Sequence, residues 1–155
     1  MDISFRTDQG RFNYRVCGVI IRQNCLLIMR DDVCPYFYLP GGRVQMHESA
    51  DAAILREIQE ETGFALSIVR PLWMGQAFFV EETSQESFHE ICIYYLLDGS
   101  ALPDKSFFHR EESHANHFEW VSFQDLSKRY FYPEFIKERI FHLPEHLEIL
   151  IENKI

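Results

Sequence analysis

Three glutamates that are close together in the sequence are the strongest chemical signal in this chain. Glu57, Glu60 and Glu61 are spaced i, i+3 and i+4, so a helix would bring their carboxylates close together. Neighbouring carboxylates repel one another unless a cation lies between them, and hard divalent ions such as Mg²⁺ or Mn²⁺ prefer oxygen ligands. The spacing therefore indicates a metal site, with a solvated acidic helix face as the alternative.

The residues around these glutamates predict the helix that would carry them. Residues 49–62 form the strongest helical pattern in the sequence, with Ser49 as the N-cap and Gly63 as the C-terminal stop. Asp51 in the first turn favours the positive end of the helix dipole. The acidic residues are therefore expected on one rigid element.

The positions of the apolar residues make a metal site as strong an alternative as a solvated face. At about 100° per residue, Ile54, Leu55 and Ile58 form a stripe that should face a sheet. The glutamates fall beside this stripe, whereas a solvated acidic face should lie opposite to it. Pro40-Gly41-Gly42, just upstream, breaks the chain close to the start of the helix.

The longer segment from Gly42 to Phe64 resembles the Nudix box. Five residues separate Gly42 from Glu48, and seven more precede the run that begins at Arg56. This matches G-x5-E-x7-R-E-U-x-E-E-x-G-U at every defined position, where U is a bulky aliphatic or aromatic residue. Seven fixed identities, each at roughly one in fifteen by average usage, would match by chance in about one such chain in a million. The box covers 23 of the 155 residues.

The resemblance implies a fold, a reaction and a cofactor. Nudix proteins typically fold as an α/β/α sandwich around a mixed sheet, an α+β arrangement in which the box forms a loop, a helix and a second loop. They cleave a pyrophosphate bond in a nucleoside diphosphate linked to another moiety, using water and Mg²⁺ or Mn²⁺. Position by position, Glu57, Glu60, Glu61 and the Gly41 carbonyl would hold the metal.

Two further residues of the box acquire expected roles from the resemblance. Glu48 would orient the carboxylate cluster, and Arg56 would pair with its members. The catalytic residue that acts as the base differs among family members, and Glu57 is one candidate. The expected catalytic set is Glu48, Arg56, Glu57, Glu60 and Glu61.

Residues outside the glutamate cluster could complete such a site. Arg43 follows the glycine pair, where the family often places a cation against phosphate, and Arg30 could reach the same cleft; a plain surface charge is the alternative for each. Glu111 or Glu112 could supply a later carboxylate, or both could be solvent-facing loop acids. Glu119 is expected to be structural.

The substrate is not specified by the sequence. The markers that distinguish ADP-ribose, dinucleoside polyphosphate, NADH, coenzyme A and oxidised nucleotide branches are absent downstream of the box. Tyr130, Phe131 and Tyr132 could stack on a base, or could pack in the core. His109, His114 and His117 could bind zinc, although a flexible loop is the simpler expectation. A non-catalytic nucleotide sensor with a Nudix fold is the alternative function.

Composition limits the partners and the setting. The chain has 155 residues, 24 of them acidic and 15 basic, with a formal net charge of −9. One domain over residues 1–155 is expected. The charge argues against nucleic acid and anionic membranes as partners. It does not argue against a small nucleoside diphosphate derivative, because a bound metal makes the local charge positive.

The cysteines indicate the cellular setting. Four cysteines without paired spacing and no secretory pattern indicate a reduced, cytoplasmic protein. Homodimers are common in the family, and the aromatic content could serve such an interface.

The remaining elements are expected to surround the helix as strands. Apolar runs predict strands at 14–21 and 25–29, joined by a tight turn at Gln23-Asn24, in a sheet that is covered on both faces. Further strand-rich segments are expected at 65–80, 88–97 and 119–123, a polar loop at 98–116, a helical turn at 124–128, and a last helix that starts near Pro133 and is interrupted by Pro144.

Overall fold

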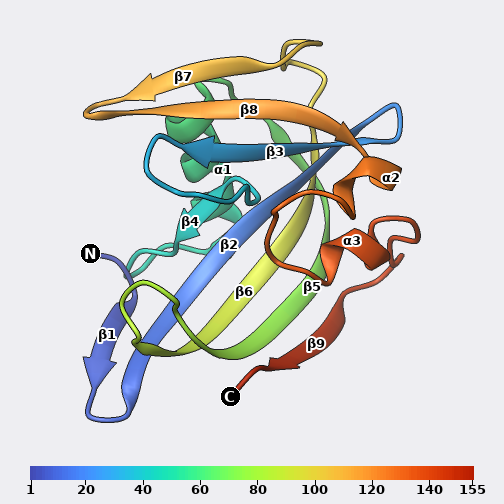
Figure 1. Cartoon of the computed structure of the whole chain (residues 1–155). Coiled ribbons are helices and arrows are strands. Elements are labelled where there is room, and N and C mark those ends of the chain that lie inside the picture. The colour runs from blue at the N-terminus through green and yellow to red at the C-terminus, as the bar shows by residue number, and fades with distance from the viewer.

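A mixed β-sheet with three helices makes up the computed structural model, which describes residues 1–155 (Figure 1). The nine strands are β1 (Ser4–Thr7), β2 (Gly10–Arg22), β3 (Cys25–Asp31), β4 (Gly41–Arg43), β5 (Ser67–Val80), β6 (Ser87–Asp98), β7 (Phe107–Glu111), β8 (His114–Ser122) and β9 (Glu148–Asn153). The helices are α1 (Ala50–Thr62), α2 (Phe123–Leu126) and α3 (Ile136–Arg139).

The strand β2 organises the sheet because it pairs with four other strands. The main order is β7-β8-β3-β2-β6-β5-β9, while β1 and β4 pair with β2 outside this path. Strand β2 runs parallel to β6 and antiparallel to β3 and β4, and β5 runs parallel to β9. The α+β fold with a mixed sheet, predicted from the box, is confirmed.

Side chains on opposite faces of the sheet belong to two separate apolar clusters. On one face, which we call the α1 face, Val16 and Ile20 of β2 pack in one cluster with Ile54 and Ile58 of α1. On the other, the α3 face, the second cluster includes Val19 of β2 and residues of α2 and α3. Alternating residues of one strand thus enter different cores, which confirms that the central strands are covered on both sides (Figure 1).

The local signals that predicted α1 are borne out in its geometry. The Ser49 side chain accepts a hydrogen bond from the Ala52 N–H at 3.1 Å. At the other end, Gly63 has φ of 81°, and its N–H donates to the Gln59 carbonyl at 2.9 Å. This left-handed conformation suits glycine, and it ends the helix two residues after Glu61.

The β2–β3 hairpin also forms where the sequence predicts it. Gln23 and Asn24 both have positive φ, 50° and 59°, as a two-residue turn of type I′ requires. Both predicted strands of the hairpin are longer in the structure, and β1 is an additional strand. Gly41 and Gly42, expected with Pro40 as a break in the chain, belong to the short strand β4, which pairs with β2.

Two predictions near the C-terminus are wrong. The segment 98–116, expected as a polar loop, contains β7, which pairs antiparallel with β8. The expected final helix is reduced to the four residues of α3, and the chain continues as β9 along β5. Strand β9 pairs with the distant strand β5, and such pairing leaves no local signature in the sequence. Strand β7 pairs with the neighbouring β8 across a two-residue turn, within a segment too polar to be recognised as a strand.

None of the helices has the length and apolarity that crossing a bilayer requires.

The four cysteines are free thiols. Cys17 and Cys92 are buried, with their Sγ atoms 3.5 Å apart, while Cys25 and Cys34 are partly buried.

Candidate functional site

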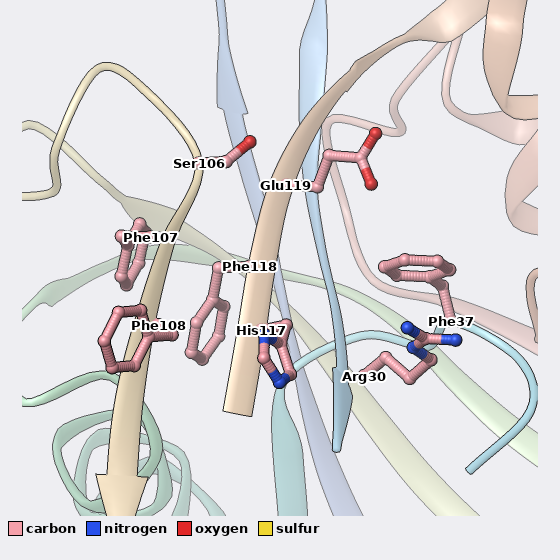
Figure 2. A pocket seen from close by; sticks show the side chains of 8 residues that line it. All are labelled: Arg30, Phe37, Ser106, Phe107, Phe108, His117, Phe118 and Glu119. Carbon is pink, nitrogen blue, oxygen red and sulfur yellow. The ribbon is translucent and has the colours of Figure 1, made fainter. Parts of the chain in front are cut away.

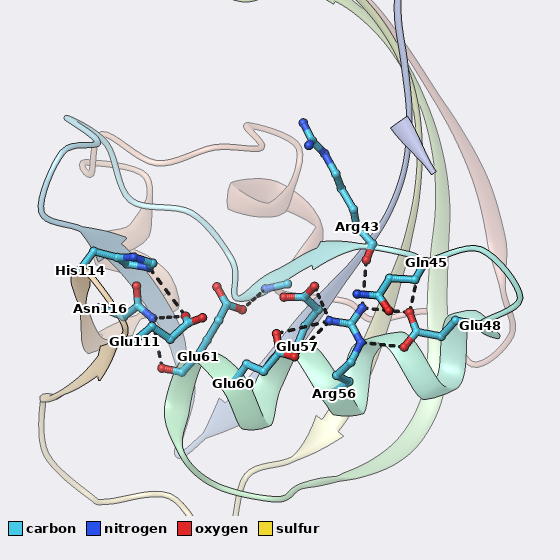
Figure 3. Close-up of polar contacts among 11 residues, drawn as sticks. Arg43, Gln45, Glu48, Arg56, Glu57, Glu60, Glu61, Glu111, His114 and Asn116 are labelled. Atoms are coloured by element: carbon cyan, nitrogen blue, oxygen red, sulfur yellow. Dashed lines mark hydrogen bonds and ion pairs between the residues drawn. The ribbon is translucent and has the colours of Figure 1, made fainter. Parts of the chain in front are cut away.

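The helix α1 presents its glutamates to the glycine pair of β4 (Figure 3). Glu61 is only 9% exposed, and its Oε1 accepts a hydrogen bond from the Gly41 N–H at 2.8 Å. A β-carbon on Gly42 would overlap the carboxylate of Glu57. The glycines therefore let the backbone of β4 approach the acidic face of the helix closely.

Arg56 is the hub of the ion pairs in this cluster (Figure 3). Its guanidinium donates to both oxygens of Glu48, at 2.7 and 2.9 Å, and to Glu57 Oε1 at 2.9 Å. A weaker contact of 3.3 Å reaches Glu60, and one nitrogen donates to the Arg43 carbonyl at 3.1 Å. Arg56 thus connects the loop that precedes α1 to the acidic face of the helix.

The carboxylates differ in how well their charge is stabilised. Burial raises the pKa of Glu61 well above its usual value, and the charges of Glu57 and Glu111 add to this effect. Burial also raises the pKa of Glu57, although the hydrogen bond from Arg56 opposes it. The hydrogen bond from Arg56 lowers the pKa of Glu48. A buried carboxylate beside others of like charge gains most from a cation.

The candidate ligands are of the chemical type that a hard divalent ion prefers, although they do not converge on one position in this structure. Glu57, Glu60, Glu61 and the Gly41 carbonyl offer only oxygen, the ligand that Mg²⁺ and Mn²⁺ prefer. No group of three acidic, histidine or cysteine side chains converges as a bound ion would require. Glu57 and Glu60 instead direct oxygens to Arg56, so these side chains would have to turn to hold a metal.

The β7–β8 hairpin brings one further carboxylate to this cluster. Asn116 of β8 is almost fully buried, and its Nδ2 donates to the Glu61 carbonyl at 3.2 Å and to Glu111 Oε1 at 2.8 Å. Of the two candidate acids, Glu111 therefore lies beside the end of α1 (Figure 3). Glu112 is exposed in the hairpin turn, with φ of 36°.

The two candidate arginines lie in different places. The Arg43 side chain points away from the Arg56 cluster (Figure 3). Arg30 is exposed, and its guanidinium lies 5.2 Å from the centre of the Phe37 ring. It lines an open hollow of about 370 Å³ together with Phe108 and His117 (Figure 2). Arg30 forms no ion pair with the carboxylates of α1.

The aromatic segment near the end of the chain divides between core and surface. Phe131 is fully buried, in agreement with the core alternative. The rings of Tyr130 and Tyr132 lie 5.6 and 5.0 Å from that of Tyr36, and Tyr130 is half exposed. These three tyrosines, which we call the tyrosine cluster, offer aromatic surface beside α3.

The three histidines lie in paired strands and not in a flexible loop. His117 contacts Asp32 at 2.8 Å, and His114 Nε2 lies 3.8 Å from Glu111. His109 lies under Gly63, where an added β-carbon would come within 2.9 Å of its ring. Glu119, expected to be structural, pairs with Arg129 at 2.8 Å.

Sequence reasoning missed Asn116 and Arg15 as residues near the cluster. The positive charge of Arg15, in β2, lowers the pKa of both Glu57 and Glu61 against the effect of burial. A signal for Arg15 was available, because it is the one charged residue in the apolar run 14–21. Asn116 had none, because its role depends on how β8 meets the end of α1.

The fold and this acidic helix define the class of protein. The model of the NUDIX domain matches residues 11–141, which is most of the chain. The chain therefore belongs to the Nudix family.

Curated relatives match over only part of the chain. The chain is 57% identical over 42 residues to a Bacillus subtilis protein named as a candidate 8-oxo-dGTP diphosphatase, covering 27% of this chain and 28% of that protein. It is 41% identical over 51 residues to the ADP-ribose pyrophosphatase of Methanocaldococcus jannaschii, covering 31% and 30%. The matched segments span less than a third of either relative.

Solved structures match over nearly the whole fold. The MutT protein of Bacillus halodurans superposes with a TM-score of 0.65 at 13% identity, covering 91% of this chain and 89% of that chain. A Nudix hydrolase of Nitrosomonas europaea gives 0.63 at 17% identity, covering 96% and 82%. At such identities the likeness shows the fold alone.

Proposed function

We propose that this chain is a metal-dependent pyrophosphohydrolase that cleaves a nucleoside diphosphate linked to another moiety. The observation that carries the proposal is the buried Glu61 beside Glu57 and Gly41, on the helix that bears the complete Nudix box. A buried carboxylate without a partner charge destabilises the fold, and a bound cation would compensate its charge.

In this proposal Glu57, Glu60, Glu61 and the Gly41 carbonyl hold Mg²⁺ or Mn²⁺. The bound metal would lower the pKa of water and neutralise the diphosphate. Glu48 and Arg56 position the carboxylates, because Arg56 ties the loop that carries Glu48 to the helix. Glu111 lies where it could add an oxygen to the site, held there by Asn116.

The substrate class follows from the charge of the site and the names of relatives. Relatives named for 8-oxo-dGTP and ADP-ribose act on small nucleotides, and a diphosphate would be attracted to a metal held by these glutamates. Arg43 would contact phosphate. The tyrosine cluster could stack on a base, whereas Arg30, stacked on Phe37 outside the carboxylate cluster, is the weaker candidate for substrate contact.

The test is hydrolysis of a panel of nucleoside triphosphates, nucleotide sugars and dinucleotides, with Mg²⁺ or Mn²⁺. The wild type should release a nucleoside monophosphate from at least one compound, together with pyrophosphate or the phosphorylated second moiety, and Glu60→Gln and Glu61→Gln should lose most of this activity. The variant Lys128→Gln, which removes an exposed charge outside the cluster, is the control. If no compound is cleaved and the glutamine variants bind nucleotide as tightly as the wild type, the sensor function replaces the enzyme.

A further inference from the structure

Arg15 is a partly buried cation for which the protein supplies no ion pair. Its Nε is enclosed and has no hydrogen-bond partner, and no carboxylate lies within 4.0 Å of its guanidinium nitrogens. Burying a charge is expensive unless it is paired. The Arg15 guanidinium thus has no anion at contact distance, and Glu90 acts on it only from farther away.

A second arginine lies directly across the strand pair. Arg15 of β2 and Arg43 of β4 are register partners, so their side chains project from the same face of the sheet. Arg43 also has no ion pair. Like charges directly opposite each other destabilise a strand pair, and an anion between them removes this cost. Because Cys17, two residues after Arg15, enters the second cluster, this face is the α3 face.

The charge of Arg15 also reaches the groups proposed to act on the substrate. Burial lowers the pKa of Arg15, but Glu90 and other neighbours raise it by more, so the guanidinium remains charged. The same charge acts on Glu57, Glu61 and Tyr36. The arginines lie on the α3 face and the helix that carries the carboxylates lies on the α1 face. Strand β4 between them is only three residues long, so a diphosphate that extends around its end would contact both sets of residues.

We propose that Arg15 and Arg43 together bind one phosphate of the substrate, while the metal held by the glutamates binds the other phosphate. This role rests on the proposed pyrophosphohydrolase function. A guanidinium donates two parallel hydrogen bonds to a phosphate, and two guanidiniums on neighbouring strands can hold it from two sides. Arg15 is then a binding residue that fixes where the diphosphate lies relative to the helix.

The test measures binding of inorganic pyrophosphate in EDTA by calorimetry, so that no metal contributes. The variants are Arg15→Gln and Arg15→Lys, with Arg70→Gln as the matched control, because Arg70 is a half-buried arginine that donates to the Pro144 carbonyl. We expect Arg15→Gln to bind at least about tenfold more weakly, which is about 1.4 kcal/mol. Arg15→Lys should be intermediate, and Arg70→Gln unchanged. Thermal unfolding of each variant verifies folding, and Arg15→Lys carries the test if Arg15→Gln does not fold.

The outcomes separate this proposal from the proposed function. If Arg15→Gln or the folded Arg15→Lys binds pyrophosphate as tightly as the wild type, or if the wild type does not bind it, the arginine site is wrong, whatever the hydrolysis panel shows. Arg15-dependent binding without turnover of any compound would support the arginine site and refute the enzyme. With a cleaved substrate, Arg15→Gln should raise KM at least tenfold, and an unchanged KM would overturn the arginine site alone.

Discussion

Glu60 and Glu61 are adjacent in the sequence, yet their surroundings are very different. The Glu60 side chain is 48% exposed, whereas Glu61 lies in the interior against the Gly41 N–H and near Glu57. Solvent screens the charge of Glu60, but Glu61 is desolvated and repelled. At the scale of the residue, therefore, most of the destabilisation that comes from keeping these carboxylates together is due to Glu61.

The substitution Glu61→Gln should make the metal-free protein more stable and the enzyme inactive. Glutamine keeps the acceptor for the Gly41 N–H and removes the buried charge, so we expect a gain of about 1 kcal/mol, seen as a few degrees in thermal unfolding in EDTA. Activity should fall at least about 100-fold. Glu60→Gln is the control, since it should lose activity without this gain. A lower midpoint for Glu61→Gln would contradict the prediction.

The stabilising effect of Glu61→Gln should also depend on pH. Because the pKa of Glu61 is raised on folding, the folded state takes up a proton more readily than the unfolded chain. The penalty is absent below the usual glutamate pKa and is present in full above the raised one. The difference in unfolding temperature between the variant and the wild type should therefore shrink as the pH falls from 8 towards about 4.5. A constant difference would show that charge is not its origin.

The substitution Gly42→Ala should reduce activity by displacing Glu57. The added methyl group would overlap the Glu57 carboxylate, and a misplacement of about 1 Å can cost about 100-fold in rate. The double variant Gly42→Ala/Glu57→Asp tests this cause, because a shorter carboxylate leaves room for the methyl group. The double variant should be no less active than Glu57→Asp alone, and additive losses would point to a different cause.

At the scale of the element, α1 works as a rigid carrier because its two ends are fixed. Ser49 caps the first turn, Gly63 ends the last, and Ile54 and Ile58 hold the intervening turns against the sheet. The side chain of Asn116 then links the final turn to the β7–β8 hairpin. The glutamates are positioned by these contacts and not by one another.

The substitution Ser49→Ala should cost about 1 kcal/mol of unfolding free energy, because the Ala52 N–H loses its acceptor. Urea unfolding measures the loss as a lower midpoint with an unchanged slope. Ser49→Asp keeps an acceptor and should lie within a few tenths of a kcal/mol of the wild type, by about the usual ranking of N-caps. If Ser49→Ala is as stable as the wild type, the cap does not hold this helix.

The helix could be predicted from the sequence because its signals are local. The cap, the stop and the spacing of the glutamates all lie between Ser49 and Gly63, and the structure has the helix with these boundaries. Strand β9 could not be predicted, because its backbone is paired by the distant strand β5. Strand β7 forms a local hairpin with β8, but its polar sequence did not indicate a strand. Arg15 stands out in the sequence as a charge within an apolar run, but its position opposite Arg43 could not be predicted, because it is a property of the register between β2 and β4.

At the scale of the whole molecule, the sheet separates two apolar clusters, and the candidate site lies at the short strand β4 and the end of α1. Strand β2 contributes residues to both clusters, and β4 joins the sheet only through β2. The site is therefore attached to a strand that both cores share. Binding at the site should consequently be visible in the unfolding of the entire domain.

Addition of Mg²⁺ or Mn²⁺ should raise the unfolding temperature of the wild type relative to EDTA. A ligand that binds only the folded state at 100 times its Kd stabilises by about 2.7 kcal/mol. KCl at equal ionic strength controls for screening of the net charge of −9. Glu61→Gln should show a much smaller shift with the divalent ion, and an equal shift would place the ion elsewhere.

Arg56 has a consequence for how the protein would respond to the supply of divalent ions. Its guanidinium already holds oxygens of Glu57 and Glu60, so it acts as a built-in competitor for the groups that a metal requires. The free energy of ion binding would be reduced by the free energy needed to separate Arg56 from these glutamates. The observed affinity for the ion would thus be weaker than the ligands alone would give. The protein would therefore fill its metal site only at higher ion concentrations than the same ligands would need without Arg56, and would release the ion more readily when its concentration falls.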